Sequence, residues 1–369
     1  MMSKINTEVL KIHPSFQLNK IQADAFDLVE IAKKFQEQGE PFEQEIGDFL
    51  IDWLKPEPHI FVKTSGSTGT PKEISIEKQH MVNSALATGK FFKLPEETTA
   101  LLCLPVSYIA GKMMLVRAMV LGWHIDCVQP KSNPLDLLYK RYDFCAMTPF
   151  QLDNSLARLH LIKKLIVGGG AVSVHLKKLV QGINTKIYET YGMTETVTHI
   201  AARKVNSKKN KKKKGPIPFK VLANISVSVD KRNCLVIKAP QISNGTIVTN
   251  DVVELLSYKK FILKGRYDNV INSGGIKIHP EQVEKKLQKI ILQRFFITSL
   301  PDDALGEKVI LFIEAAFSEE ALAEVKALVE NLKTLDKYEQ PKKIYFVEKF
   351  EETHTGKINR INTLKARLA

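Results

Sequence analysis

The chain has 369 residues, 44% of them hydrophobic, enough for two or three domains around a large core. Its 54 basic and 40 acidic residues give a formal net charge of +14. Its four cysteines (Cys103, Cys127, Cys145 and Cys234) lack C-x-x-C spacing, which argues against a disulfide framework or a zinc site. The N-terminus has no apolar signal core and no segment has the length of a membrane span, so we expect a soluble cytoplasmic protein.

The first motif in chain order is the segment 64–72, which alternates small hydroxyl residues with glycines and ends in Pro-Lys. Such a loop can direct backbone N–H groups and hydroxyls onto a polyphosphate, because glycine permits close approach and positive φ. Its spacing is neither that of a Walker A loop nor that of a dinucleotide-binding turn. Taken alone it could also be a surface loop. The candidate phosphate-binding residues are Thr64, Ser65, Gly66, Ser67, Thr68, Gly69 and Lys72.

From residue 59 onward, short apolar runs alternate with helix-like segments, which predicts a parallel α/β sheet. The expected strands are 100–104, 125–128, 144–147, 165–167 and 186–188, and the expected helices are 78–92, 110–121, 149–159 and 173–182. Turns that follow such strands lie at the sheet edge where α/β proteins bind ligands. The glycines at 168–170 form a turn of this kind.

The pattern changes beyond Gly265. A strand pair, a helix beginning near Pro280, two strands, a helix around 319–333 and a strand at 343–347 predict a smaller α+β unit. We therefore expect one domain of residues 1–265 and a second of residues 266–369, with the boundary at Arg266–Asp268. Residues 1–58 are expected to complete the large sheet or to cover it.

Five further motifs follow the 64–72 loop in a fixed order: GGGA at 168–171, YGMTET at 191–196, TND at 249–251, GRYD at 265–268 continuing to SGG at 273–275, and THTGKINR at 353–360. Together they resemble the adenylate-forming superfamily of acyl- and aryl-CoA ligases, luciferases and peptide-synthetase adenylation domains. The resemblance runs from residue 59 to the end of the chain. It implies a large N-terminal α/β domain with mainly parallel sheets and a small mobile α+β C-terminal domain.

The resemblance also implies a two-step reaction. A carboxylic acid reacts with ATP and Mg²⁺ to give an acyl-adenylate and pyrophosphate, and the acyl group then passes to the thiol of coenzyme A. An anionic nucleophile has to reach a polyanionic α-phosphate, so the site needs positive charge and oriented donors.

By this resemblance, the 64–72 loop holds the β- and γ-phosphates. Glu195 holds Mg²⁺, which prefers oxygen ligands, and Thr194 donates to the α-phosphate. Lys357 bridges the acyl carboxylate and the α-phosphate during adenylation. Gly356 beside it frees the backbone.

For the nucleoside, the resemblance places Gly168, Gly169 and Gly170 against adenine and the acyl group. Tyr191, followed by Gly192, stacks on the base. Asp251 accepts from both ribose hydroxyls, and Arg266 also reaches the ribose. Asn250 stands where the family usually has glycine. Asparagine tolerates the left-handed backbone conformation better than most other residues.

The second half-reaction of the family follows a rotation of the small domain about a hinge, which corresponds here to Asp268. The rotation withdraws Lys357 and brings Gly274 and Gly275 toward the thiol of coenzyme A.

The acyl pocket is predicted from a narrower similarity. The segments 104–111 and 115–118 resemble a pattern of o-succinylbenzoate–CoA ligases, enzymes of menaquinone synthesis, except that Tyr108 replaces a histidine. A phenol can pack and hydrogen bond but cannot carry positive charge. The proposed acid has a second, unreactive carboxylate, which needs a cation or donors if buried. Arg117 is the first candidate, followed by Lys112 and His199; the alternative for Arg117 is a surface charge on an amphipathic helix.

Other functions stay open at this point. The chain could activate a different aryl or short-chain acid, or pass its adenylate to a carrier-protein thiol. A basic nucleic-acid-binding protein is the alternative from another class, because Arg203, Lys204 and the tract 208–214 supply eight positive charges. That tract has no interleaved aromatic residues, so we interpret it as a solvated loop, or as a region that attracts polyanionic coenzyme A. The sequence gives no oligomeric state.

Overall fold

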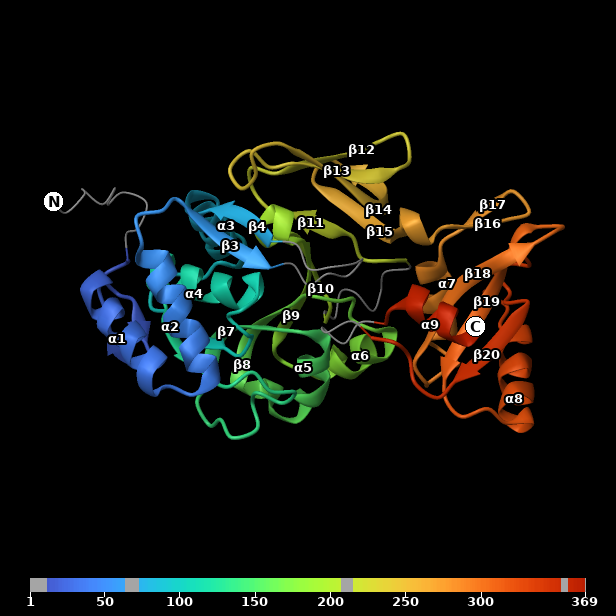
Figure 1. The fold of residues 1–369 in the computed structure, drawn as a ribbon, viewed down its shortest axis with the longest axis horizontal. Coiled ribbons are helices and arrows are strands. Elements are labelled where there is room, and N and C mark those ends of the chain that lie inside the picture. The colour runs from blue at the N-terminus through green and yellow to red at the C-terminus, as the bar shows by residue number, and fades with distance from the viewer. Residues whose placement is uncertain (1–11, 64–72, 207–214, 353–357, 369) are drawn as a thin grey trace.

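The computed structural model describes residues 12–63, 73–206, 215–352 and 358–368 (Figure 1). One large sheet dominates it. Its strands are β1 (Gln17–Leu18), β2 (Ile21–Gln22), β5 (Thr99–Leu102), β6 (His124–Cys127), β7 (Tyr142–Met147), β8 (Ile162–Val167), β9 (Lys186–Gly192), β10 (His199–Lys204), β11 (Phe219–Val221), β12 (Ser226–Val229), β13 (Cys234–Lys238), β14 (Thr246–Ser257) and β15 (Lys260–Arg266). Within the described residues their order is β12-β13-β14-β15-β11-β10-β9-β8-β7-β5-β6-β1-β2.

The centre of this sheet is parallel, from β6 through β5, β7 and β8 to β9. The helices α3 (Lys78–Phe92), α4 (Ile109–Leu121), α5 (Pro149–Asn154) and α6 (Val174–Leu179) alternate with the strands along the chain. This confirms the predicted alternation of strands and helices. The segment predicted as one helix over 149–159 is divided at Ser155, where α5 ends and a short 3₁₀ helix, Leu156–Leu161, begins.

Beyond β9 the sheet continues as antiparallel strands, β10, β11, β15, β14, β13 and β12. The prediction of a mainly parallel sheet therefore describes the central part of the sheet. Hairpin turns can join antiparallel neighbours, whereas parallel neighbours need a long crossover. The two parts meet at β9, which is parallel to β8 and antiparallel to β10.

The described part of residues 1–58 does both things expected of it. β1 extends the sheet by pairing in parallel with β6. The helices α1 (Ala25–Gln38) and α2 (Pro41–Leu54) pack against each other and cover the sheet, with Phe16, Leu28 and Trp53 in the same core as the central strands. In Figure 1 these two helices lie at the opposite end of the molecule from the C-terminal unit.

The C-terminal residues form the predicted smaller α+β unit. Its strands are β16 (Ile271–Ser273), β17 (Ile276–Ile278), β18 (Phe295–Asp302), β19 (Gly306–Glu314) and β20 (Lys343–Val347), and its helices are α7 (Pro280–Leu287), α8 (Glu319–Glu330) and α9 (Arg360–Leu368). Val283, Ile297 and Leu311 are central to a core of its own. The chain leaves the large sheet at Arg266 and enters the second sheet at Ile271, so the predicted boundary lies in the short segment between them.

A separate hairpin of β3 (His59–Lys63) and β4 (Glu73–Glu77) precedes α3. Lys63 pairs with Glu73, so the residues that flank the 64–72 motif lie side by side. The motif itself lies outside the described residues.

The cysteines are free thiols, and Cys103, Cys145 and Cys234 are buried, as expected for reduced core residues. In the part of the chain that the structure describes, no helix has the length and apolar character needed to cross a membrane.

Candidate active site

Three of the predicted nucleotide-binding residues and the predicted hinge residue meet at the edge where β9, β14 and β15 lie close together. The Tyr191 hydroxyl donates to Asp251 Oδ2 at 2.6 Å. Asp251 is paired in the sheet with Arg266, whose Nε lies 3.7 Å from Asp251 Oδ1. Arg266 Nη2 also donates to Asp268 at 3.0 Å. We call these residues (Tyr191, Asp251, Arg266 and Asp268) the ribose corner, after their predicted role.

The electrostatics of the ribose corner favour a protonated Tyr191 and a charged Arg266. Burial, together with the adjacent Asp251 carboxylate, raises the pKa of the Tyr191 hydroxyl, so that it stays a donor. Burial of Arg266 opposes its charge, but the hydrogen bond to Asp268 and the charge of Asp251 prevail and raise the Arg266 pKa. An Asp251 carboxylate fixed in this way can accept further hydrogen bonds from a vicinal diol.

Tyr191 is also packed by aromatic neighbours. Its ring meets Phe261 edge-on at 5.2 Å between centroids and lies 5.9 Å from Phe219, and only 8% of the residue is exposed. Stacking of the ring on adenine stays a prediction.

Thr194 and Glu195 begin a short 3₁₀ helix directly after β9 and line an open cleft of about 480 Å³. The opposite wall comes from the β3–β4 hairpin, including His59 and Ser75, and the loop after β13 supplies Asn244. The β3–β4 hairpin and the predicted metal ligand thus line one cleft.

The Glu195 carboxylate suits the role of a magnesium ligand. It is exposed, and within the described residues it makes no hydrogen bond or ion pair, so its oxygens are available. No cluster of three or more acidic, histidine or cysteine side chains occurs among those residues. Mg²⁺ that binds nucleotides takes one or two carboxylates and completes its shell with phosphates and water. One free carboxylate on a polar cleft fits that pattern.

The motif glycines have different structural settings. Gly168, Gly169 and Gly170 follow the carboxyl end of β8, and a side chain at Gly169 would meet nothing within 4 Å, which leaves room for a ligand. At Gly192, a Cβ would lie 2.3 Å from the carbonyl oxygen of Thr198. Close approach of backbone to backbone therefore already requires glycine at 192, whatever its part in nucleotide binding.

Gly274 and Gly275 form the two-residue turn between β16 and β17, with φ of 59° and 79°. Positive φ at both positions is the signature of a tight hairpin turn that favours glycine. The turn accounts for both glycines, and their part in the coenzyme A step stays a prediction.

Arg117 is buried, contrary to the alternative of a surface charge on an amphipathic helix. It is 2% exposed, on a helix whose residues 113–119 are all buried. Its Nη2 donates to Thr198 Oγ1 at 3.1 Å, while Nε has no partner in the described structure. Burial lowers the Arg117 pKa to about 9.

His199 lies beside Arg117 at the start of β10, 5% exposed, with its ring edge-on to Phe92. Burial, and then the charge of Arg117, lower the pKa of His199 well below its ordinary value. His199 is therefore a neutral hydrogen-bonding group. This corrects the idea that it could supply a second cation.

The structure does not bring Lys112 to this group. Its ammonium lies over the ring of Phe49 on α2, at 4.8 Å from the centroid. Tyr108 is the half-buried N-cap residue of α4. The acyl-pocket candidates that come together are thus Arg117 and His199.

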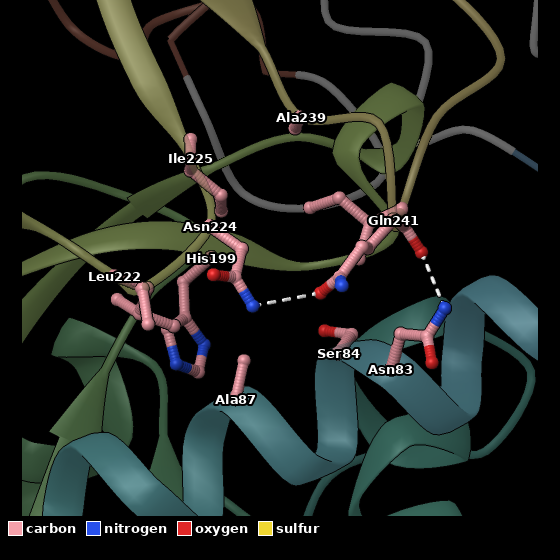
Figure 2. A pocket seen from close by; sticks show the side chains of 11 residues that line it. Asn83, Ser84, Ala87, His199, Leu222, Asn224, Ile225, Ala239 and Gln241 are labelled. Atoms are coloured by element: carbon pink, nitrogen blue, oxygen red, sulfur yellow. Dashed lines mark hydrogen bonds between the residues drawn. The ribbon is translucent and has the colours of Figure 1, made fainter.

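A small pocket borders His199 (Figure 2). The imidazole lies beside Leu222 and Ala87, and Asn224 donates to the side chain of Gln241 on the far wall. The enclosed volume of about 10 Å³ has room for about one water molecule.

The predicted adenylation lysine, Lys357, lies outside the described residues, as do Thr353 and Gly356. The chain on both sides of them is fixed. Glu352 and Ile358 form a β-bridge, and Arg360 Nη2 lies 3.0 Å from Glu284 Oε1 on α7.

Sequence reasoning missed several residues that hold the site together. Thr198 links Arg117 to His199. Asn250, which the sequence indicated only as a turn residue, donates to Asp268. Glu189 on β9 is a buried carboxylate that binds Arg203 and Lys177. Thr198 lies two residues after the YGMTET motif, which could have drawn attention to it. Glu189 had no signal in the sequence.

Comparison with known proteins places these features in one family. A family model described as "AMP-binding enzyme" matches residues 12–244. This confirms the resemblance drawn from the motifs: the chain belongs to the AMP-binding enzyme family.

Individual relatives agree with this assignment. A 2-succinylbenzoate–CoA ligase of Staphylococcus epidermidis is 25% identical over 80% of this chain and 67% of that protein. One from Listeria monocytogenes is 25% identical over 98% of this chain and 83% of that protein.

Two solved structures extend the comparison. An acyl-CoA synthetase (AMP-forming)/AMP-acid ligase II-like protein from Dyadobacter fermentans is 36% identical, with a TM-score of 0.60, covering 91% of this chain and 97% of that one. The o-succinylbenzoate coenzyme A synthetase of Bacillus subtilis, in complex with ATP and magnesium, has a TM-score of 0.71 at 17% identity over 94% and 83% of the two chains. The latter shares the fold.

Proposed function

We propose that this chain is an ATP- and Mg²⁺-dependent acid–CoA ligase, and that its acid is o-succinylbenzoate. The chain would form the acyl-adenylate and then the thioester, a reaction of menaquinone synthesis. Family membership, the ribose corner and the available carboxylate of Glu195 support the adenylate-forming step. The names of the bacterial relatives support the choice of coenzyme A and of the acid.

The observation that carries the choice of acid is the unmatched charge of Arg117. Within the described residues no carboxylate lies within 4 Å of its guanidinium, and burial alone accounts for the lowered Arg117 pKa. Burying a charge is costly unless a partner compensates it. A dicarboxylic acid that reacts through one carboxylate would supply that partner with the other, whereas a monocarboxylic acid would leave Arg117 unmatched.

The enclosed volume beside His199 is far smaller than an aromatic acid. Binding of the acid next to Arg117 therefore requires the surrounding side chains to separate. We place this movement in the loop after β13. Two hydrogen bonds join the loop to α3 and β4: Asn83 donates to the Gln241 carbonyl, and Asn244 donates to the Glu77 carboxylate.

The proposed division of labour follows from the geometry. Asp251, which accepts a hydrogen bond from Tyr191, would also accept hydrogen bonds from the ribose hydroxyls. Glu195 would hold the magnesium ion that neutralises phosphate charge when ATP is bound. We place the swivel of the C-terminal unit at Asp268. Its carboxylate accepts from Asn250 and Arg266 in this structure, so a rotation there would break both contacts.

The test is pyrophosphate release measured for the purified protein with o-succinylbenzoate, 4-oxo-4-phenylbutanoate, benzoate and short fatty acids. The second acid has the same skeleton as the first but lacks the ring carboxylate. We expect kcat/KM to be about 100-fold higher for o-succinylbenzoate than for 4-oxo-4-phenylbutanoate, the difference expected of a buried charge pair. Equal rates with the two acids, or a preference for benzoate, would refute the proposed substrate.

A further inference from the structure

A continuous line of hydrogen-bonding groups runs from Arg117 through the core to α3. Arg117 Nη2 donates to Thr198 Oγ1 at 3.1 Å, and Thr198 Oγ1 lies 3.3 Å from His199 Nδ1. On the other side of the ring, His199 Nε2 lies 3.4 Å from Thr88 Oγ1, which donates to the Ser84 carbonyl at 2.9 Å. We call this set (Arg117, Thr198, His199, Thr88 and Ser84) the relay.

The direction of each hydrogen bond in the relay follows from donor counting. The only proton of the Thr88 hydroxyl goes to the Ser84 carbonyl, so Thr88 Oγ1 can only accept from the imidazole. His199 Nε2 must therefore carry a proton. Because His199 is buried and neutral, Nδ1 has none and accepts from the Thr198 hydroxyl. The Thr198 oxygen is then free to accept from Arg117.

The opposite tautomer fits poorly. With its proton on Nδ1, His199 would turn a lone pair toward the Thr88 oxygen, whose proton is already used. Thr198 Oγ1 would also receive two donors and leave its own proton without an acceptor in the relay. A doubly protonated ring would place a second positive charge beside Arg117 in the core.

We propose that Thr198 is a positioning residue that orients the Arg117 guanidinium for the unreactive carboxylate of the substrate, and that neutral His199, fixed by Thr88, is what orients Thr198. This inference rests on the proposed function. Arg117 contacts the substrate carboxylate; Thr198, His199 and Thr88 act through it. Of these groups, Figure 2 shows the His199 ring at the wall of the small pocket, close to Ala87 on the same helix as Thr88.

The first experiment compares Thr198→Val, which is close in shape but lacks the hydroxyl, with Thr198→Ser, which keeps it. In Thr198→Val we expect KM for o-succinylbenzoate to rise about 10- to 100-fold, the size expected for a hydrogen bond to a charged group. KM for ATP and for 4-oxo-4-phenylbutanoate should stay within about twofold in the same variant. Thr198→Ser should restore KM for o-succinylbenzoate.

Two controls separate positioning from structural damage. Thr185→Val removes another buried threonine hydroxyl, which donates to the Leu159 carbonyl outside the relay, and should leave the ratio of the two KM values unchanged. In an Arg117→Met background, Thr198→Val should have no further effect on that ratio. An equal rise in KM for both acids, or an undiminished effect without Arg117, would overturn the proposal.

The second readout does not depend on the identity of the acid. Nitrogen-15 NMR of histidine-labelled protein at pH 7 should show His199 as neutral with the proton on Nε2, and Thr88→Val should change the tautomer ratio. A proton found on Nδ1 in the unmodified protein would overturn the relay. If this spectrum is as expected but the unmodified enzyme has no activity with o-succinylbenzoate, then the proposed substrate is wrong. The directions of the hydrogen bonds in the relay are supported in that case.

Discussion

Arg117 illustrates how a residue that we propose for binding can cost stability. Its guanidinium is 2% exposed and uses few of its five N–H groups, with one hydrogen bond to Thr198 and a weak contact from Nη1 to the Met114 sulfur at 3.7 Å. A buried cation with so few hydrogen-bond partners lowers the stability of the fold. Residues that reduce stability in this way are typical of functional sites.

We therefore predict that Arg117→Met stabilises the protein while it impairs recognition of the dicarboxylic acid. Methionine is shorter but unbranched, fills the space of the arginine stem and carries no charge, so the free energy of unfolding should rise by about 1–2 kcal/mol. Urea denaturation at pH 7 measures it. Exposed Arg141→Met is the matched control and should change stability by less than about 0.5 kcal/mol. A clear loss of stability in Arg117→Met would mean that the charge is compensated in the folded chain.

Among the elements, β9 has the central place, because it joins the parallel and antiparallel parts of the sheet and ends in the site. Glu189 fixes it to its neighbours. The Glu189 carboxylate is 4% exposed and lies 2.7 Å from Arg203 Nη2 on β10 and 3.1 Å from Lys177 Nζ on α6. It also accepts from the backbone of Val172, just after the glycine turn.

We predict that Glu189→Gln lowers the free energy of unfolding by about 3 kcal/mol at pH 7, because it leaves two cations with a neutral partner in a buried setting. Burial by itself would raise the pKa of Glu189. The positive charges of Arg203 and Lys177 outweigh this effect and hold the pKa below its ordinary value of 4.5. A carboxyl group whose pKa is lower in the folded than in the unfolded state stabilises the fold at pH values above its unfolded-state pKa. It loses this stabilising effect as the pH falls through its folded-state pKa.

The free energies of unfolding of Glu189→Gln and of the unmodified protein should therefore differ most at pH 7. This difference should shrink as the pH is lowered below 4.5. Urea denaturation at several pH values checks this. Glu254→Gln, which removes the partly exposed pair with Lys264, is the control and should cost less than about 1 kcal/mol. A pH-independent difference for Glu189→Gln would show that its ion pairs do not account for the effect.

The whole molecule consists of a large α/β unit and a smaller α+β unit, joined between Arg266 and Ile271. The lysine motif belongs to the small unit, whose α9 is tied to α7 through Arg360 and Glu284. The phosphate loop and Glu195 belong to the large unit. With the site residues that we propose, adenylation would require the two units to cooperate.

We predict that Lys357→Ala abolishes adenylate formation but still lets supplied acyl-adenylate react with coenzyme A. The lysine charge is needed only where the α-phosphate is attacked. Pyrophosphate release and thioester formation, measured separately, test this. Exposed Lys365→Ala on α9 should change neither rate. Equal loss of both half-reactions in Lys357→Ala would refute the assignment.

The sequence alone determined the family, the order of the elements in the parallel centre of the large sheet and in the C-terminal unit, and most of the ribose corner. These features are encoded locally: strands and helices by the spacing of apolar residues, and Tyr191, Asp251 and Arg266 by short motifs. Gly274 and Gly275 were identified in the sequence only as part of a motif, and the hairpin turn that they form was not predicted.

Only the tertiary structure decided which side chains lie together and in what surroundings. Burial turned Arg117 from a possible surface charge into an unmatched core cation, and it made His199 neutral. It also brought Thr88 and Thr198, 110 positions apart in the chain, to the two sides of one imidazole. Contacts between distant segments, and the loss of water around a charge, depend on how the elements pack, and no local pattern of residues records them.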